Sequence, residues 1–416
     1  MMLYFKRAAG VERVSMRIGM MLDMYKPYVS GITTYVSLNK RVLESLGHTV
    51  FVFTFGAEDY EDDELHVVRS PGLPLNINDT GFHVSFRYSR PAQRKVRSMD
   101  VIHVHHPFLS GPLALRYAKA RGIPVIFTNH TRYDLYAHHY LPSIIPDAVG
   151  QTVLQTYLPN FCQRCDLVIA PSPGLARVLA ELGITADVKI IPNGIDLSPF
   201  QNPTRRLTRA EVGLSDDQVV LIYLGRLSPE KNLAFLLRAF NGVASACPSA
   251  ALLLVGDGPE SDNLRDQAQK AGVADRVKFT GQVDYADVPA YLRLADIFVT
   301  ASETEVHPIS LIEALASGLP ALGIESPGVG DTIVDGQNGF LSTSDLAVFT
   351  AKLVRLVMEP QTRRRLAENA AQSARLYDIN RTVQMVLVEY ERLASHRIQR
   401  MRGWAGFGQR LRHLLP

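Results

Sequence analysis

Glutamates gather around the start of one apolar helical pattern in TASETEVHPISLIEALASGLP, residues 300–320. Pro308 is placed like a first helical residue and Gly318 like a terminating one. Glu305 then lies on the loop that enters the helix, and Glu313 lies inside it. A helix N-terminus attracts phosphate because its free N–H groups and peptide dipoles point outward. A carboxylate beside such a seat is better suited to accept hydrogen bonds from hydroxyl groups, although a solvated helix start would explain the same residues.

Two cations follow an apolar run in LGRLSPEKN, where Arg226 and Lys231 come just after a predicted buried strand. Arginine offers a planar fork and lysine a point charge, and the two together suit a pyrophosphate. The next apolar run ends in VGDGPE, in which Gly256 would allow close backbone approach to a ligand. A turn or a surface charge explains each motif taken singly. Their order along the chain indicates a diphosphate site.

These residues need a scaffold, and the chain from Met16 alternates short β-branched runs with amphipathic segments. Such alternation predicts parallel sheets covered by helices, with ligand-binding residues at the carboxyl ends of the strands. It is interrupted by a Pro, Gly and Asn-rich run after residue 191 and then restarts. We therefore expect an α/β protein with two doubly wound Rossmann-like domains facing each other across a cleft. The expected parts are an N-terminal domain (16–196), a C-terminal domain (197–379), a helix near 380–395 that packs back on the first domain, and a basic tail (396–416).

Composition bounds the remaining possibilities. The chain has 416 residues, 46% of them apolar and 20% charged, which is typical of a globular protein with two domains. A net charge of +3 is too small to indicate a nucleic-acid partner. No apolar run is long enough to span a bilayer, and the first 15 residues lack the features of a secretory signal. The three cysteines, Cys162, Cys165 and Cys247, form no disulfide framework and fit a reducing, cytoplasmic compartment.

The motifs taken together resemble a known family. GRLSPEKN, GDGP, FTGQV and ADIFVTAS, followed by Glu305 and Glu313 with seven residues between them, resemble the signatures of retaining glycosyltransferases of family 4, which have the GT-B fold. PNGID at 192–196 and DGQNGFL at 335–341 match as well. The resemblance extends over residues 16–390. Within this family the chain is most similar to the bacterial diacylglycerol glucosyltransferases. Such an ordered series is far more specific than any one motif.

The resemblance implies that the C-terminal domain binds a nucleotide-sugar donor. By that likeness Arg226 and Lys231 hold the diphosphate, and Glu305 binds hydroxyls of the sugar. Glu313 would bind the ribose hydroxyls, while main-chain groups near Gln282 and Val283 would hold the base. The paired glutamates would thus address hydroxyl groups on opposite sides of one diphosphate.

The helix start departs from the family pattern. Val306-His307-Pro308-Ile309 stands where the family usually has a glycine-rich, aromatic stretch. Pro308 has no N–H, so we expect the donor site around Pro308 and Ile309 to lose at least one hydrogen-bond donor.

The resemblance also assigns two residues of the first domain. Gly31 in Ser30-Gly31 resembles the loop that approaches the donor phosphates, and His130 resembles the family's active-site histidine near the reacting carbon. A histidine at a strand end is also commonly structural. His103 and His105 would share one face of a strand, but no acidic partner is apparent, and the family resembled needs neither metal nor cofactor.

The acceptor is suggested by a shorter likeness. Residues 129–142, NHTRYDLYAHHYLP, resemble a segment of diacylglycerol glucosyltransferases, although an aromatic loop packed on the domain would look the same. The basic stretch 86–97, flanked by Phe82, Phe86 and Tyr88, suits an anionic membrane surface, and so does the tail from Ser395. Glycines in the tail predict that it becomes ordered only on contact with lipid.

We therefore expect an enzyme that moves a hexose with retention from UDP-glucose to a membrane lipid, 1,2-diacylglycerol, at the inner face of the cell membrane. Phosphatidylinositol or a soluble or polysaccharide acceptor is the nearest alternative. A nucleotide-sugar epimerase of GT-B fold should lack the paired glutamates with the cationic clamp. An inert scaffold should have lost one of these four residues, and none is lost.

Overall fold

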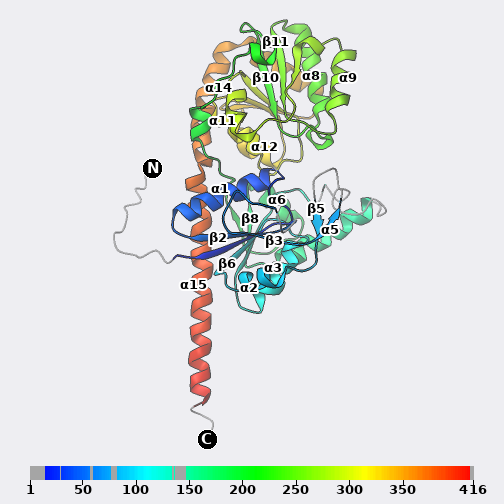
Figure 1. Cartoon of the computed structure of the whole chain (residues 1–416). Coiled ribbons are helices and arrows are strands. Elements are labelled where there is room, and N and C mark those ends of the chain that lie inside the picture. Colours follow the sequence, from blue (N-terminus) through cyan, green and yellow to red (C-terminus); the bar gives the residue numbers. More distant parts are fainter. Residues whose placement is uncertain are drawn as a thin grey trace, which may run out of the picture. The chain divides into compact units, whose positions relative to one another are not determined.

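The computed structural model describes residues 15–28, 30–56, 60–75, 82–133, 135 and 147–412. It divides into two compact units. The first contains the described residues within 1–29, 39–126 and 390–416, and the second contains 30–38 and 127–389. Two sheets with covering helices confirm the expected α/β class (Figure 1). The first 14 residues and most of the segment 129–142 beyond Tyr133 lie outside the described part of the chain.

The first sheet has seven strands in the order β3-β2-β1-β6-β7-β8-β9. Its strands are β1 (Arg17–Met21), β2 (Thr49–Phe55), β3 (Val67–Ser70), β6 (Val101–Val104), β7 (Val125–Thr128), β8 (Leu167–Ala170) and β9 (Val188–Ile190). Its helices are α1 (Gly31–Ser45), α2 (Arg90–Val96), α3 (Ser110–Lys119), α5 (Asp147–Cys162) and α6 (Pro173–Glu181). Strands β6, β7 and β8 are buried at every residue, as expected for a sheet covered on both faces. A small antiparallel hairpin, β4 (Leu73–Leu75) with β5 (Phe82–Val84), was not expected from the sequence.

The second sheet has six parallel strands in the order β12-β11-β10-β13-β14-β15. They are β10 (Val219–Leu224), β11 (Ala250–Val255), β12 (Val277–Phe279), β13 (Ile297–Thr300), β14 (Ala321–Ile324) and β15 (Gly339–Ser342). The helices are α7 (Ser198–Gln201), α8 (Leu233–Ala246), α9 (Ser261–Lys270), α10 (Val288–Leu292), α11 (Ile309–Ala316), α12 (Pro327–Thr332), α13 (Leu346–Met358), α14 (Pro360–Ser373) and α15 (Ile379–Arg412).

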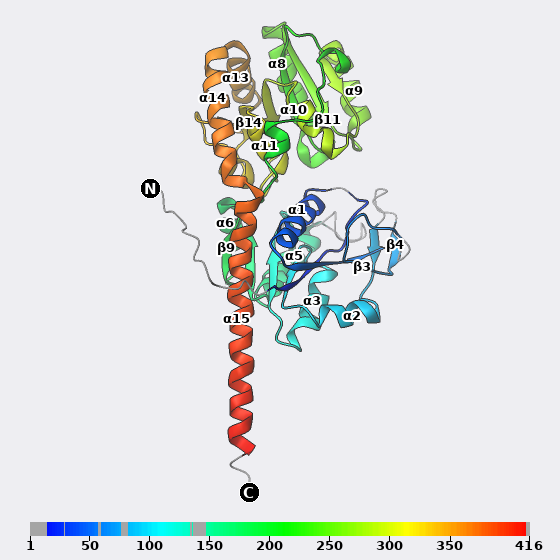
Figure 2. The same cartoon turned by 60° about the vertical axis from the view of Figure 1, so that its left-hand side comes forward.

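Alternation along β10 feeds two separate cores. Leu221 and Tyr223 pack with α8, α9 and α13 on one face, whereas Val220, Ile222 and Leu224 pack with α10 and α11 on the other. Figure 2 shows α13 and α14 beside this sheet. Because both faces are covered, a ligand can reach the sheet only at the ends of its strands.

The last helix, α15, is longer than expected. It runs from Ile379 to Arg412 without a break, so the expectation that the tail is unstructured until it meets lipid is wrong. Extending an existing helix avoids the cost of nucleation, which outweighs glycine penalties of about 1 kcal/mol each. Within the first unit, the hydroxyl of Tyr390 lies 2.6 Å from Nδ1 of His103, and Arg397 donates to the carbonyl of Met99 at 3.1 Å. No described helix combines the length and apolar character that crossing a bilayer requires.

Candidate active site

The end of β10 presents the two predicted cations. The buried hydroxyl of Tyr223 donates to the carbonyl of Arg226 at 3.0 Å and so fixes the chain as it leaves the strand. The side chain of Arg226 is exposed and makes no ion pair within the described residues. Lys231 ends a single 3-10 turn, Pro229–Lys231, directly before α8. A buried tyrosine therefore sets the backbone from which both cations project.

Lys231 and Glu305 form an ion pair, with Nζ 2.7 Å from Oε1. Their side chains are 24% and 20% exposed, so the pair is only partly accessible to water. Burial lowers the pKa of Lys231, but the charge and hydrogen bond of Glu305 raise it more, and the net pKa lies above its usual value. Lys231 thus remains a fixed positive charge. The resemblance assigned Lys231 to the diphosphate and Glu305 to the sugar of a donor, and the structure pairs the two side chains directly.

The loop that carries Glu305 is anchored by its backbone to α12. The N–H of Gly328 donates to the carbonyl of Glu305 at 2.9 Å. A Cβ atom at Gly328 would lie only 2.4 Å from the carbonyl carbon of Val306, a distance that real Cβ atoms essentially never show. Gly328 is therefore a glycine because the Glu305 loop passes directly over it.

The start of α11 corrects one expectation. Pro308 is the N-cap residue and the helix begins at Ile309, so Pro308 is not the first helical residue. The missing N–H belongs to the cap, and the N–H groups of Ile309, Ser310 and Leu311 remain without intrahelical acceptors. Gly318 follows the helix with a φ of 78°, which confirms it as the terminating residue. The helix start therefore keeps three donors that an anion could use.

Glu313 lies inside α11 and is buried, with 3% of its surface exposed. Its Oε1 has no hydrogen-bond partner among the described residues. Burial raises the pKa of Glu313 to about 7, partly offset by a hydrogen bond from Tyr285. A buried oxygen without a partner is costly, and a hydroxyl group of a ligand would satisfy it.

The glycine after β11 has a different explanation from the one expected. Gly256 has a φ of 130°, and a Cβ atom there would lie 2.1 Å from the carbonyl oxygen of Gly225. Its N–H donates to the carbonyl of Gly281 at 3.1 Å. Contact between neighbouring strand ends thus suffices to require this glycine. Gln282 is exposed and Val283 is half-buried against the core, just beyond β12.

His130 follows the carboxyl end of β7, and Gly31 follows β1 along the chain. The half-buried ring of His130 meets the ring of Tyr35 edge-on, with centroids 4.9 Å apart. Gly31 is the first residue of α1, and Ser30 and Thr33 exchange hydrogen bonds there, as in a helix cap. Within the second unit, a Cβ atom at Gly31 would lie 3.7 Å from Cδ1 of Ile309. The structure therefore brings Gly31 close to the start of α11.

The other histidines and the cysteines have structural surroundings. His103 is buried and paired with Tyr390, and burial lowers its pKa to about 3. Burial raises the pKa of Cys162 to about 12, and the thiol of Cys165 forms no disulfide and donates to the carbonyl of Phe161 at 3.5 Å. The described residues contain no cluster of His, Cys, Asp or Glu that could hold a metal ion. These groups show neither metal-ligand geometry nor a reactive thiolate.

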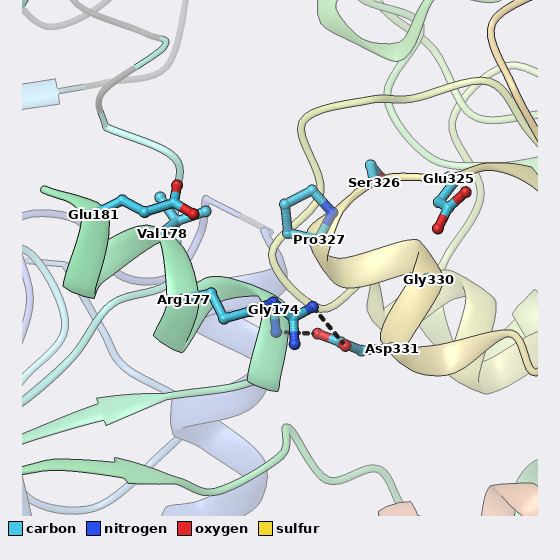
Figure 3. A pocket seen from close by; sticks show the side chains of 9 residues that line it. All are labelled: Gly174, Arg177, Val178, Glu181, Glu325, Ser326, Pro327, Gly330 and Asp331. Atoms are coloured by element: carbon cyan, nitrogen blue, oxygen red, sulfur yellow. Dashed lines mark hydrogen bonds and ion pairs between the residues drawn. The ribbon is translucent and has the colours of Figure 1, made fainter.

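A cavity of about 380 Å³ lies beside α6 and α12 (Figure 3). Asp331 accepts a hydrogen bond from the N–H of Gly174 and lies 3.7 Å from the guanidinium of Arg177. The cavity is lined by Gly174, Arg177, Val178, Glu181, Glu325, Ser326, Pro327, Gly330 and Asp331. None of the residues predicted to bind a donor lines this cavity.

Some supporting residues were missed from the sequence. Tyr223 stands in an otherwise aliphatic strand, and its polar hydroxyl could have indicated a nearby partner. Asn193, read only as part of a family match and a linker, donates through its backbone N–H to Nδ1 of His307 at 3.3 Å. Gly328 gave no local signal, because its neighbour in space is far away in sequence.

The chain is similar to known proteins over most of its length. The family model described as Glycosyltransferase Family 4 matches residues 29–199, and that of glycosyl transferases group 1 matches residues 204–373. The chain is 32% identical over 356 residues to an alpha-monoglucosyldiacylglycerol synthase of Streptococcus pneumoniae (83% of this chain, 79% of that protein). It is 30% identical over 377 residues to the synthase of the same name from Acholeplasma laidlawii (87% and 93%).

The fold is also found among solved structures. Sucrose-phosphate synthase from Thermosynechococcus elongatus superposes with a TM-score of 0.73 at 20% identity, over 92% of this chain and 100% of that one. The two family models cover successive parts of the chain and the relatives match most of it, so the protein belongs to the family 4 glycosyltransferases and is a hexosyltransferase of GT-B fold.

Proposed function

We propose that the protein transfers glucose from UDP-glucose to 1,2-diacylglycerol with retention, giving an α-glucosyl lipid. The observation that carries the proposal is the similarity to two alpha-monoglucosyldiacylglycerol synthases over more than four-fifths of this chain. The local geometry is compatible with such a donor, because cations, a helix start and a buried carboxylate belong to neighbouring strand ends of one sheet.

Each group has a proposed role at the donor. Arg226 and Lys231 bind the diphosphate, helped by the free N–H groups at the start of α11. Glu305 accepts hydrogen bonds from the sugar hydroxyls. Glu313 accepts them from the ribose, which would satisfy its buried Oε1. His130 faces the reacting carbon.

The proposed chemical step occurs on one face of the sugar. The acceptor oxygen forms a bond to the anomeric carbon on the face from which the bond to the diphosphate oxygen breaks. The acceptor proton passes to the leaving phosphate oxygen, and UDP is released. The positive charges of Arg226 and Lys231 stabilise the charge that grows on the diphosphate, and no divalent metal is needed for this step.

The acceptor lies in a membrane, and we propose that the stretch 86–97 meets its anionic inner face. Phe86 is 79% exposed, and Arg87, Arg90 and Arg94 are exposed near it. Tyr88 is buried, which corrects the expectation that it flanks the surface, and the side chain of Phe82 lies outside the described residues. An exposed aromatic ring beside several arginines is suited to an anionic interface.

Product analysis with a panel of donors and acceptors tests the activity. Purified protein is incubated with UDP- or GDP-sugars and with diacylglycerol, phosphatidylinositol or a soluble glycan, and the anomeric configuration of any product is determined by NMR. We expect α-glucosyl diacylglycerol from UDP-glucose. A product formed only on phosphatidylinositol or on the soluble glycan would contradict the acceptor assignment, and a β-linked product would contradict retention.

Co-sedimentation with vesicles tests the membrane surface. Arg90→Glu with Arg94→Glu should reduce binding to phosphatidylglycerol vesicles at low salt. A matched control is Lys270→Glu with Arg364→Glu, which makes the same charge change at exposed positions on α9 and α14. Deletion of residues 396–416 tests the tail in the same assay. Equal binding by the Arg90/Arg94 variant and the control would contradict the assignment of 86–97.

A further inference from the structure

The loop between the two glutamates holds a histidine, within the stretch that is usually glycine-rich and aromatic in the resembled family. His307 is buried, with 5% of its surface exposed, and two hydrogen bonds join it to Asn193. The backbone N–H of Asn193 donates to Nδ1 of His307 at 3.3 Å. The side-chain Nδ2 of Asn193 donates to the carbonyl of His307 at 3.2 Å.

These two bonds define the chemical state of both side chains. Because a backbone N–H can only donate, Nδ1 of His307 carries no proton and the ring is neutral with its proton on Nε2. Burial lowers the pKa of His307 to about 3, which agrees with a neutral ring. Because a carbonyl can only accept, the amide of Asn193 must present its nitrogen to His307. Both bonds are therefore directional, and a plain aromatic ring could make only the one to its carbonyl.

The ring also has an apolar contact. It meets the ring of Tyr377 edge-on, with centroids 5.1 Å apart. Phenylalanine could make this contact equally well, since it depends on ring shape and not on a nitrogen acceptor. The acceptor at Nδ1 is thus the property that histidine adds at this position.

His307, which is bonded to Asn193, lies two residues after Glu305 in the sequence. On one side the carbonyl of Glu305 accepts from the N–H of Gly328 at 2.9 Å, and on the other side His307 is held by Asn193. Only Val306 lies between the two anchored residues, and the residue after His307, Pro308, caps α11. The direction of the Glu305 side chain consequently depends on both anchors.

We propose that Asn193 and His307 form a clamp that positions Glu305 for the donor sugar. This inference rests on the proposed function, in which Glu305 binds sugar hydroxyls. His307 and Asn193 are positioning residues that act through the loop and do not touch the donor. Loss of the clamp should therefore weaken recognition of the sugar, whereas binding of the nucleotide, through Arg226 and Glu313 outside the loop, should be retained.

Two substitutions at one position separate the bond from the packing. His307→Phe keeps an aromatic ring beside Tyr377 and removes the acceptor. His307→Asn removes the ring but can place its side-chain oxygen near the position of Nδ1. Asn193→Asp replaces the side-chain donor by an oxygen that would face the carbonyl of His307. His307→Phe leaves the buried N–H of Asn193 without its acceptor, and Asn193→Asp places one acceptor against another, so we expect each to cost roughly tenfold in a rate or binding constant.

The readouts are kcat/KM for UDP-glucose and the dissociation constant of UDP, measured by calorimetry on the full-length protein. We expect His307→Phe and Asn193→Asp to lose about tenfold in kcat/KM while the Kd of UDP changes less than about twofold. His307→Asn should recover most of the loss. The inference is overturned if His307→Phe retains wild-type kcat/KM, if UDP binding weakens in parallel, or if His307→Asn is no better than His307→Phe.

The wild-type protein separates this inference from the proposed function. If it neither transfers nor hydrolyses UDP-glucose, the donor assignment fails. If wild-type protein is active and the three variants behave like it, only the clamp fails.

Discussion

The carboxyl ends of the two sheets satisfy their polar groups in different ways. At the first sheet, buried Asp23 accepts from the N–H and hydroxyl of Ser110 at 2.7 and 2.5 Å, and His103 pairs with Tyr390. At the second sheet, Glu313 has a buried oxygen without a partner in the described chain, and Arg226 projects without an ion pair there. Buried polar groups are nearly always satisfied. The hydroxyl of Tyr88, stacked on Phe55 at the end of β2, also lacks a partner among the described residues, so the contrast lies in the unpartnered carboxylate of Glu313, which a ligand could satisfy.

Two acidic side chains at the carboxyl end of the second sheet differ in whether they already have a partner. The pair between Lys231 and Glu305 is already formed, so its geometry is set before any donor arrives. Glu313 is the opposite case, since its environment disfavours the charge that a ribose would help to stabilise. At the carboxyl end of the second sheet, the pair of Lys231 and Glu305 is thus preorganised, whereas the surroundings of Glu313 would be completed by binding of a ligand.

The largest effect should come from the cations. Arg226→Ala and Lys231→Ala should each reduce kcat about a hundredfold or more, because losing a preorganised contact to growing charge costs about 3 to 4 kcal/mol. Steady-state kinetics with UDP-glucose measures this, and thermal unfolding checks that the variants fold. Lys270→Ala, an exposed lysine at the end of α9, is the control and should be active. Near-normal kcat in Arg226→Ala or Lys231→Ala would show that this cation does not stabilise the leaving diphosphate.

A stability effect should follow from Glu313. Its folded pKa of about 7 lies above the ordinary value of 4.5, so the folded state retains a proton that the unfolded state loses. This contribution is complete below about pH 4.5 and is lost as pH rises through about 7. Glu313→Gln should therefore exceed wild type in free energy of unfolding at pH 8 by on the order of 3 kcal/mol, and match it near pH 4.5.

Urea unfolding at several pH values measures the effect of Glu313→Gln. Glu303→Gln, at an exposed glutamate just before the same helix, should leave the pH dependence unchanged. A difference between Glu313→Gln and wild type that does not grow with pH would show that the carboxylate is satisfied by the protein, as at the first sheet.

A smaller effect on activity is expected from His130, at the carboxyl end of the first sheet. His130→Ala should lower kcat/KM by at least about tenfold, or 1.4 kcal/mol, because the histidine is proposed to face the reacting carbon. Cys162→Ser and Cys165→Ser should have little effect on activity, since neither thiol has a catalytic environment. If a cysteine variant folds normally but loses activity and His130→Ala does not, the roles assigned at this edge are reversed.

The smallest effect should be that of a chelator. Transfer should persist in excess EDTA, because two cations and a helix N-terminus can supply the positive charge at the diphosphate. Initial rates with EDTA, and with added Mg²⁺ or Mn²⁺, measure this. A strict requirement for a divalent ion would show that the cations and the helix start at the second sheet do not suffice to bind the diphosphate.

The sequence by itself determined the order of strands and helices and the residues that carry charge. The apolar run that forms β10 and the terminator at Gly318 are local properties, and local patterns are readable from the chain. The start of α11 was misplaced by one residue and the tail helix was missed, because cap geometry and helix extension depend on neighbouring turns. The packing that requires a glycine at position 256 could not be read from the chain, since the carbonyl of Gly225 that it meets follows another strand.

Only the tertiary structure decided which groups meet. Lys231 and Glu305 are 74 positions apart in sequence, and Asn193 and His307 are 114 apart, so no local pattern could join them. The same holds for the missing partner of Glu313 Oε1, because satisfaction of a buried atom depends on every neighbour that folding brings to it. Residue types set the available chemistry, and the packing of distant segments set which charges are paired, which are buried and which remain open to a ligand.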